Sequence, residues 1–302
     1  MKGKFYKKII IRGILILSIL GIGGLIMMRD INEEKYVSLE DINEIQVYLN
    51  REKAHFIESE EGSEVKVKLH GKAMQGINIA HEIHNKTLVI KTQDQTSIPL
   101  YKDITLDIYI PKKSEKNLSI DTSMSPVKID ALSLESIIYN GSIGKLDIDQ
   151  LNAKKFFMKT TSGKVSIKKL NAEELQIKGK TSSINIEECI VKDGKIENPR
   201  GSITLKNTSG NLDIKGKSGK VMVAYNDFEN QNVSIETTVG SIVLELPSTT
   251  EFLLEAKTST GSFESDFPIK ITDKKNINGQ IGSKNNKVML QTSSGSMKIL
   301  KR

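Results

Sequence analysis

The chain has 302 residues, of which 37% are hydrophobic and 27% are charged, a balance typical of a globular protein. Aromatic residues make up only 5% of the chain and tryptophan is absent, which argues against proteins that stack sugars or single-stranded nucleic acids on aromatic rings. The single cysteine, Cys189, excludes an intrachain disulfide and any zinc site or iron–sulfur cluster built from several cysteines.

Positive charge is concentrated at the amino end of the chain. The formal net charge is +7, and residues 1–29 hold six lysines and arginines and no acidic residue, which leaves +1 for residues 30–302. The body is therefore nearly neutral and has no excess of basic residues that would attract a phosphate backbone. We expect no nucleic-acid partner.

Residues 9–28 form an apolar run in which Arg12 is the only charge, and about 20 apolar residues suffice for a helix to cross a bilayer. We predict a single-pass membrane anchor here, preceded by a basic cytoplasmic tail at residues 1–8 and followed by a linker at residues 29–36. The positive-inside rule places the body outside the cytoplasmic membrane. Signal-peptide cleavage at residues 21–23 would leave an apolar stub on the mature protein, so we expect the anchor to remain uncleaved.

Beyond residue 36 the sequence alternates apolar and polar residues, which is the pattern of strands with one buried face. The clearest segments lie at residues 45–47, 65–67, 88–90 and 106–110. No amphipathic helical stretch of useful length accompanies them. We therefore predict an all-β body.

A repeat of the form small-x-apolar-x-apolar runs through the second half of the chain. Its successive starts differ by 19, 19, 19, 18, 21 and 21 residues, at Gly144, Gly163, Ser182, Gly201, Gly219, Gly240 and Gly261. A second set of short strand units lies between these starts. Two strands in about 20 residues fit one coil of a parallel β-solenoid with glycine at its corners. Antiparallel hairpins packed as sandwiches are the alternative, but they need no constant repeat length.

These patterns divide the body into two parts. We predict that residues 126–302 form a repeat β-solenoid with a C-terminal cap. We predict that residues 37–125 form an N-terminal β region, either the first coils of the same solenoid or a separate β-cap.

Several motifs, taken with their order and spacing along the chain, resemble the bacterial domain of unknown function named "putative adhesin". They are residues 108–112, the Thr-Ser-Gly and Ser-Ser-Gly turns that end at Gly163, Gly210 and Gly295, and residues 244–247, 260–267 and 291–299. The resemblance covers roughly residues 40–300, and the family includes the membrane-anchored protein of the lia cell-envelope-stress operon. It implies a right-handed parallel β-helix outside the cytoplasm and brings no catalytic residues.

Histidine, serine and cysteine residues give little support for chemistry. His81 and His84 are three residues apart, a spacing that gathers ligands on a helix but points them to opposite faces of a strand, so we expect a solvated turn. His55 and His70 are isolated, and no Gly-x-Ser-x-Gly motif supports a serine hydrolase. No histidine or basic cluster lies near Cys189 in the sequence to lower its pKa, so we expect a small buried group.

Acidic residues do not gather at neighbouring levels of the aligned repeats. Asp147 and Asp149 project from one strand to the same side and would at most hold calcium weakly. We predict no metal and no cofactor. A β-helix polysaccharide lyase or hydrolase stays the alternative enzyme hypothesis.

Apolar residues do occupy some outward positions. Met222 and Val243 lie at the middle of successive first strands, and Leu253 ends the column of second strands. Outward apolar residues on adjacent coils either meet a partner or lie beneath a covering segment. We take Met222, Val243 and Leu253 as the candidate partner surface. The alternative is that residues 269–302 fold back and cap the last coils.

The combined expectation is a membrane-anchored, extracytoplasmic β-solenoid that serves as a non-catalytic structural or interaction module of the bacterial envelope, with a monomeric ectodomain. Its partner would be an envelope protein or an anionic cell-wall polymer, and Lys217 and Lys220 are candidate contacts for such a polymer or for lipid headgroups. A further alternative is an accessory role beside a membrane sensor kinase, in the response to envelope stress. This last idea follows from the family resemblance.

Overall fold

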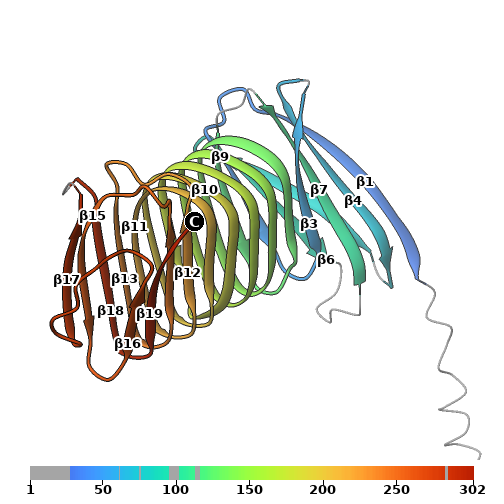
Figure 1. Ribbon diagram of the computed structural model, residues 1–302. Coiled ribbons are helices and arrows are strands. Elements are labelled where there is room, and N and C mark those ends of the chain that lie inside the picture. Colours follow the sequence, from blue (N-terminus) through green and yellow to red (C-terminus); the bar gives the residue numbers. More distant parts are fainter. Residues whose placement is uncertain (1–27, 61, 75, 95–101, 113–115, 283–284) are drawn as a thin grey trace, which may run out of the picture.

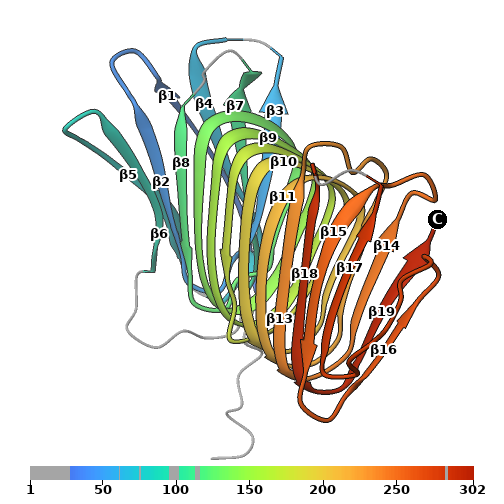
Figure 2. The ribbon, with the colours of Figure 1, turned by 60° about the vertical axis from the view of Figure 1, so that its left-hand side comes forward.

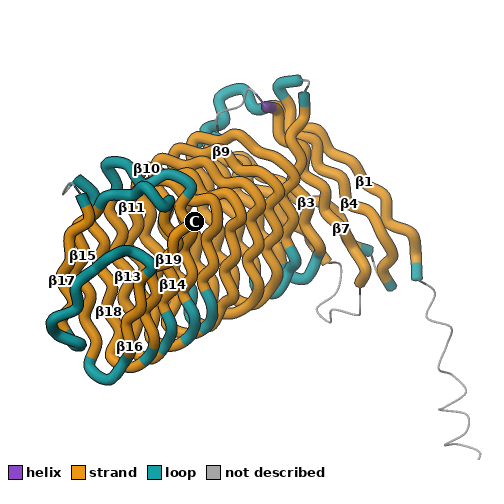
Figure 3. Tube along the Cα trace, in the orientation of Figure 1, coloured by secondary structure: helices purple, strands orange, loops and turns teal. Residues whose placement is uncertain are grey.

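The computed structural model describes residues 28–302 except 61, 75, 95–101, 113–115 and 283–284. Strands make up nearly all of this part of the chain and wind into a stack of coils (Figures 1 and 3). The apolar side chains inside the coils form one continuous core. The body is therefore all-β, as the alternation of apolar and polar residues predicts.

The predicted anchor, residues 9–28, lies outside the described residues apart from Met28, and so does the tail at residues 1–8. Within the described part of the chain, no helix is both long and apolar enough to cross a membrane. Residues 29–36, expected as a linker, lie in strand β1 (Arg29–Ser38), which pairs along its whole length with β4 (Glu64–Ala73).

The central coils consist of three long strands that bend around the corners: β9 (Val127–Lys178), β10 (Thr181–Arg200) and β11 (Ile203–Ser218). Their pairing is parallel, and Ile184 of β10 lies between Val165 of β9 and Ile203 of β11. Partners in successive coils are therefore 19 residues apart, like the sequence repeat. The parallel solenoid is confirmed for these repeats, and the sandwich of antiparallel hairpins is wrong.

Columns of apolar side chains hold the coils together. Val165, Ile184, Ile203, Val221 and Ile242 follow one another through the stack and are all buried. Burying each such side chain contributes about 1.5–3 kcal/mol. Because alternate residues point inward, one strand fills the core while its remaining residues form the outer surface.

The C-terminal coils do not follow the order of the sequence. Their strands are β12 (Val221–Tyr225), β13 (Asn232–Val239), β14 (Ile242–Leu246), β15 (Phe252–Thr258), β16 (Ser262–Ser265), β17 (Asn276–Ile281), β18 (Lys287–Ser294) and β19 (Ser296–Lys301). The last coil, β18 and β19, lies between β13/β14 and β15/β16 (Figure 2). Strand β17 pairs antiparallel with β15. Residues 269–302 thus supply both an inserted coil and an end strand.

The N-terminal end has the corresponding arrangement. Its strands after β1 are β2 (Glu44–Leu49), β3 (Lys53–Ser59), β4, β5 (Ile77–His84), β6 (Thr87–Asp94), β7 (Lys102–Pro111) and β8 (Asn117–Thr122). The coil of β2 and β3 lies between the coil of β6 and β7 and the coil that begins with β8. Strands β5 and β4 pair antiparallel with β6 and β7. Residues 37–125 therefore provide the first parallel coils together with an antiparallel extension.

A column of glycines lies at one corner of the stack, and the contacts between these glycines follow the order of the coils in space, which differs from their order in the sequence. A side chain at Gly219 would collide with the carbonyl oxygen of Gly201, and one at Gly295 would collide with that of Gly240. Gly261 would in turn meet the carbonyl of Gly295. Gly219 and Gly295 also have φ angles of 123° and 146°, which side-chain-bearing residues rarely adopt. The Ser-Ser-Gly turn that ends at Gly295 thus stacks between the turns at Gly240 and Gly261.

Two charged side chains close the N-terminal end. Both belong to β1: Glu33 Oε2 accepts a hydrogen bond from the backbone N–H of Ile79 at 2.9 Å, and Lys35 Nζ donates to the carbonyl of Ile79 at 2.6 Å. Ile79 lies in β5, opposite Thr92 of β6. The two side chains therefore satisfy backbone groups that would otherwise leave the edge of β5 open to another strand.

Candidate functional site

The structure brings two of the three candidate partner residues together. Met222 of β12 and Val243 of β14 are direct neighbours in the parallel pairing, and both are half-buried residues that alternate with the core. Leu253 lies in β15, opposite Lys287 of β18, on the face of the coil formed by β13, β18 and β15. The candidate partner surface is thus divided over two faces of the coil, and its role stays a prediction.

Polar residues border the pair of Met222 and Val243 on both sides. Thr204 precedes Met222 in the column, and Lys298 follows Val243. Glu264 follows Gly261 as Val243 follows Gly240, so the repeat spacing would place Glu264 directly after Val243 in the column. Strand β19 instead separates the two, and the ammonium group of Lys298 lies 2.7 Å from the Glu264 carboxylate. The apolar strip therefore extends over two levels only, because the inserted last coil adds a charged residue beside it.

Several carboxylates of the outer surface are paired with lysines. Asp149 Oδ1 lies 2.6 Å from the Nζ atom of Lys168 in the next coil, and its other oxygen lies 3.8 Å from Nζ of Lys128. Asp147 pairs with Lys145. The hydrogen bond to Asp149 and its negative charge raise the pKa of Lys168. Among the described residues, no group of three His, Cys, Asp or Glu side chains could hold a metal ion.

Four side chains from four strands form a cluster that the sequence does not reveal. His55 of β3 has its Nε2 atom 2.8 Å from Asp130 Oδ2 of β9 and its Nδ1 atom 3.6 Å from Asp107 Oδ1 of β7. Asp107 Oδ2 lies 2.9 Å from Nε2 of His70 in β4. Burial by itself would raise the pKa of Asp130, but hydrogen bonds from Lys128 and His55 outweigh it and lower the pKa.

This cluster links the antiparallel extension to the coils, since β4 belongs to the extension and β3, β7 and β9 belong to the coils. Up to 75 residues separate its members in the chain. Alternation within each strand predicts that His55 and His70 point outward, but only the pairing of β3 with β7 and β9 brings His55 next to its two aspartates. The two histidines are therefore not isolated, and they hold together strands that are distant in sequence.

His81 and His84 lie on strand β5, which continues to His84. The turn of this hairpin is formed by Asn85 and Lys86, whose φ angles of 48° and 64° fit a two-residue hairpin turn. The predicted turn therefore begins later than expected, because the alternating pattern continues through both histidines. Both rings are exposed, and His84 Nε2 lies 3.2 Å from Glu82 Oε2.

Cys189 is fully buried, with 0% of its surface exposed, which confirms the expectation of a small buried group. Its neighbours in the adjacent coils are Leu170 and Thr208. Burial raises the pKa of the thiol to about 12. At neutral pH the sulfur is therefore protonated, and it acts in packing.

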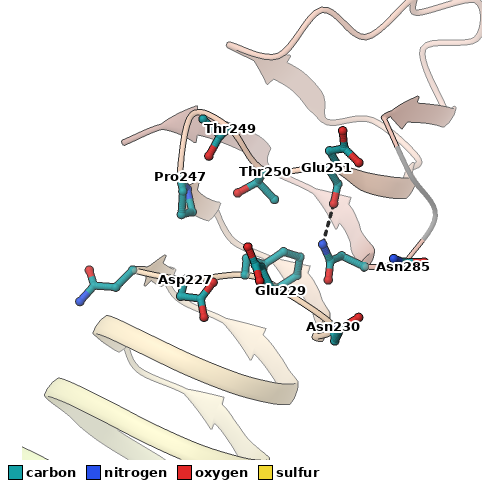
Figure 4. A pocket seen from close by; sticks show the side chains of 11 residues that line it. Asp227, Glu229, Asn230, Pro247, Thr249, Thr250, Glu251 and Asn285 are labelled. Carbon is teal, nitrogen blue, oxygen red and sulfur yellow. Dashed lines mark hydrogen bonds between the residues drawn. The ribbon is translucent and has the colours of Figure 1, made fainter.

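A polar hollow of about 400 Å³ lies between three loops near the C-terminal coils (Figure 4). Its lining includes the carboxylates of Asp227, Glu229 and Glu251. Asn286 fastens the loops, since its Nδ2 atom donates to the carbonyl of Glu251 at 2.7 Å and its Oδ1 atom accepts from the backbone N–H of Gln231 at 3.0 Å. The hollow thus arises where the inserted coil enters the stack.

Lys217 and Lys220, expected as contacts for anionic polymers or headgroups, are both exposed on the corner between β11 and β12. Their role stays a prediction.

Comparison with known proteins adds a family and a fold. A family model described as Toastrack DUF4097 matches residues 42–300, nearly the same span as the resemblance seen in the sequence. No curated protein matches the chain.

The solved structures that are similar to this chain include the following three. A putative lipid binding protein from Parabacteroides distasonis has 12% sequence identity and a TM-score of 0.52, over 89% of this chain and 96% of the other. A putative adhesin from Bacteroides fragilis has 13% identity and a TM-score of 0.48, over 90% and 97% of the two chains. A putative cell adhesion protein from Clostridium sporogenes has 14% identity and a TM-score of 0.26, over 91% and 100%.

Proposed function

The chain belongs to the Toastrack DUF4097 family, and from this premise we propose that it is a membrane-anchored, extracytoplasmic module that binds or organises other envelope components without turnover. The observation that carries this proposal is the use of the outer side chains. In coil after coil they bind the residue one level away, as in Lys154–Glu135, Lys168–Asp149, Lys169–Glu188, Asn140–Asp121, Asn211–Asp193 and Ser136–Asn117.

Such ladders give the surface a structural use. Each pair fixes one coil against the next, and a rigid stack of this kind presents extended faces to a partner. At the N-terminal end, Glu33 and Lys35 occupy the backbone groups of Ile79 on the edge of β5, which hinders pairing with another chain there. A monomeric ectodomain is part of this proposal. Right-handed winding of the coils and a link to envelope stress, both implied by the family resemblance, belong to the same proposal.

The position of β1 supports an anchored arrangement. This strand begins at Arg29, directly after the apolar run, and lies at the N-terminal end of the stack (Figure 1). The C-terminal coils lie at the opposite end. An anchor at residues 9–28 would therefore present the C-terminal coils, with Met222 and Val243, away from the membrane.

Fractionation and protease protection test this proposal. The full chain and a chain lacking residues 1–27 are expressed in a bacterium, and membranes are washed in high salt. We expect the full chain to stay with the membrane and to be cleaved by protease added outside intact protoplasts. We expect the shortened chain to be released from the membrane. A control chain with Lys217→Gln and Lys220→Gln separates anchoring from surface attraction. The proposal fails if the shortened chain still sediments or if the body is protected from external protease.

A further inference from the structure

A second hollow, of about 600 Å³, lies on the outer surface near the N-terminal coils. Its outward column consists of Lys91 in β6, Tyr48 in β2, Asp121 in β8 and Asn140 in β9, which are neighbours in the parallel pairing. Lys159, 19 residues after Asn140, lines the other end. We call this hollow, with its outward column of five residues, the corner groove. Four strand spacings make it about 19 Å long, which suits a short chain of linked units.

The floor of the corner groove is low because its residues are small. Ser123, Gly141 and Ser142 lie where the coils turn. A side chain at Gly141 would collide with the ring of Tyr139, which is buried beneath it. The depth of the groove is therefore built into the packing of the core.

Tyr48 provides a partly exposed aromatic ring within this hollow. Its surface is 43% exposed, whereas the largest aromatic side chains of the core, such as Phe56 and Phe156, are fully buried. An aromatic face attracts flat apolar patches such as the C–H face of a sugar ring, and the phenol group can bind a hydroxyl. The low aromatic content of the chain argues against extensive stacking of sugars, but this hollow has one accessible ring.

Polar groups beside Tyr48 are held in fixed positions. Asn140 Nδ2 donates to Asp121 Oδ1 at 3.0 Å, which fixes both side chains. The amide oxygen of Asn140 and further lone pairs of Asp121 remain able to accept hydrogen bonds. A stacking ring next to fixed carboxylate and amide groups is a suitable arrangement for a polyhydroxyl ligand.

The lysines at the two ends of the groove differ in whether they form an ion pair. Lys91 is bound to Glu82 at 3.0 Å. Lys159 is exposed, and within the described part of the chain no carboxylate lies at ion-pair distance from it. A free ammonium group at the end of a hydroxyl-binding groove favours an anionic group on the ligand.

We propose that the corner groove binds an anionic oligosaccharide, with one sugar ring stacked on Tyr48, hydroxyl groups on Asp121 and Asn140, and a carboxylate or phosphate near Lys159. This inference rests on the proposed function as a binding module and names the chemical class of its partner. A nucleic acid is disfavoured, because it would place a phosphate beside Asp121 and gain few lysines.

Saturation-transfer NMR and titration on the full chain, in a detergent without a sugar headgroup, test the proposal. The probes are trigalacturonate, maltotriose and phosphorylated maltotriose. We expect at least one acidic probe to bind at least fivefold more tightly than maltotriose, and the comparison of the two acidic probes identifies the preferred acid group. Tetrathymidylate serves as the nucleic-acid probe and is expected to bind more weakly.

Variants assign the binding to the groove. Tyr48→Ala and Lys159→Ala should each weaken the acidic probe at least fivefold, while Tyr48→Phe keeps stacking and should change affinity less than twofold. Lys155→Ala is the matched control, since Lys155 is exposed on the same strand. The inference is wrong if no sugar binds, if the nucleotide binds best, or if the groove variants leave affinity unchanged. Binding in vitro does not depend on the membrane anchor, so either proposal can fail alone.

Discussion

Asn198 binds both backbone polar groups of Ser182, the residue that begins the same repeat: its Nδ2 atom donates to the carbonyl at 2.8 Å, and its Oδ1 atom accepts from the N–H at 3.4 Å. Ser182 stands in the corner column that glycines occupy at Gly163 and Gly201. Both Asn198 and Ser182 are 1% exposed. The asparagine therefore replaces water for a corner that the core encloses.

We expect Asn198→Ala to lower the free energy of unfolding by about 2 kcal/mol, because it leaves buried backbone groups of Ser182 without partners. Asn171→Ala is the matched control, since Asn171 is exposed. It should change the free energy by less than about 0.5 kcal/mol. Urea unfolding measures both. Equal stability of the two variants would show that Asn198 is not needed at this corner.

Glycine is required at Gly219 but not three residues earlier. A side chain at Gly219 would meet the backbone of Gly201, and the φ angle of 123° adds strain. We expect Gly219→Ala to cost about 3 kcal/mol. At Gly216 the nearest atom to a new Cβ is the Cγ2 of Thr237, at 3.6 Å, so Gly216→Ala should cost less than about 1 kcal/mol. Thermal unfolding compares them, and similar melting temperatures would contradict the steric argument.

The sequence repeat predicts the content of each coil but not the order of the coils at the ends. Periodicity correctly makes Met222 and Val243 neighbours, because the chain passes directly from one level to the next there. It places Glu264 next to Val243, although β19 lies between them. The inserted coil matches its neighbours equally well, with Met297 opposite Ile242 and Phe263, so the pattern is the same in either order.

Sites formed between strands are the second feature that the sequence does not predict. His55, Asp107 and Asp130 each read as an ordinary outward residue, and only the pairing of three strands unites them. Tyr48 likewise gains its place in a groove from its neighbours in β6 and β8. A single sequence predicts which side of a strand such residues face, but the pairing of distant strands depends on the whole fold.

The pair Met222 and Val243 is expected to matter for binding more than for folding. Both face outward and are half-buried, so Met222→Ser combined with Val243→Ser should lower the free energy of unfolding by only about 1 kcal/mol. Val223→Ser is the control within the core and should cost about 3 kcal/mol. If the double variant keeps its fold but no longer retains an envelope component in a pull-down from intact cells, the strip is an interaction surface. A large loss of stability would instead show that the strip is structural.

Removal of the acceptor at Glu33 should open the edge of β5. In Glu33→Ala the backbone N–H of Ile79 loses its partner, so we expect its amide hydrogen to exchange at least tenfold faster. Glu34→Ala is the matched control, because Glu34 binds Lys66 and Lys68 instead. Hydrogen exchange of a peptide that covers residues 77–84 measures both variants. Unchanged exchange at Ile79 in Glu33→Ala would show that the edge is protected by other means.

Glu52 should make the stability of the N-terminal coils depend on acid. Burial by itself would raise the pKa of this carboxyl, which is 4% exposed, but hydrogen bonds from Thr92 and from the backbone N–H groups of Asn50 and Arg51 outweigh it and lower the pKa. A lowered folded-state pKa gives stability that is present above the unfolded-state value and is lost as the pH falls through the folded-state value. Glu52→Gln should therefore be less stable than the native chain at pH 7, and the difference should shrink between about pH 5 and pH 3. Urea unfolding across this range measures the difference, and a constant gap would refute the role of the charged carboxylate.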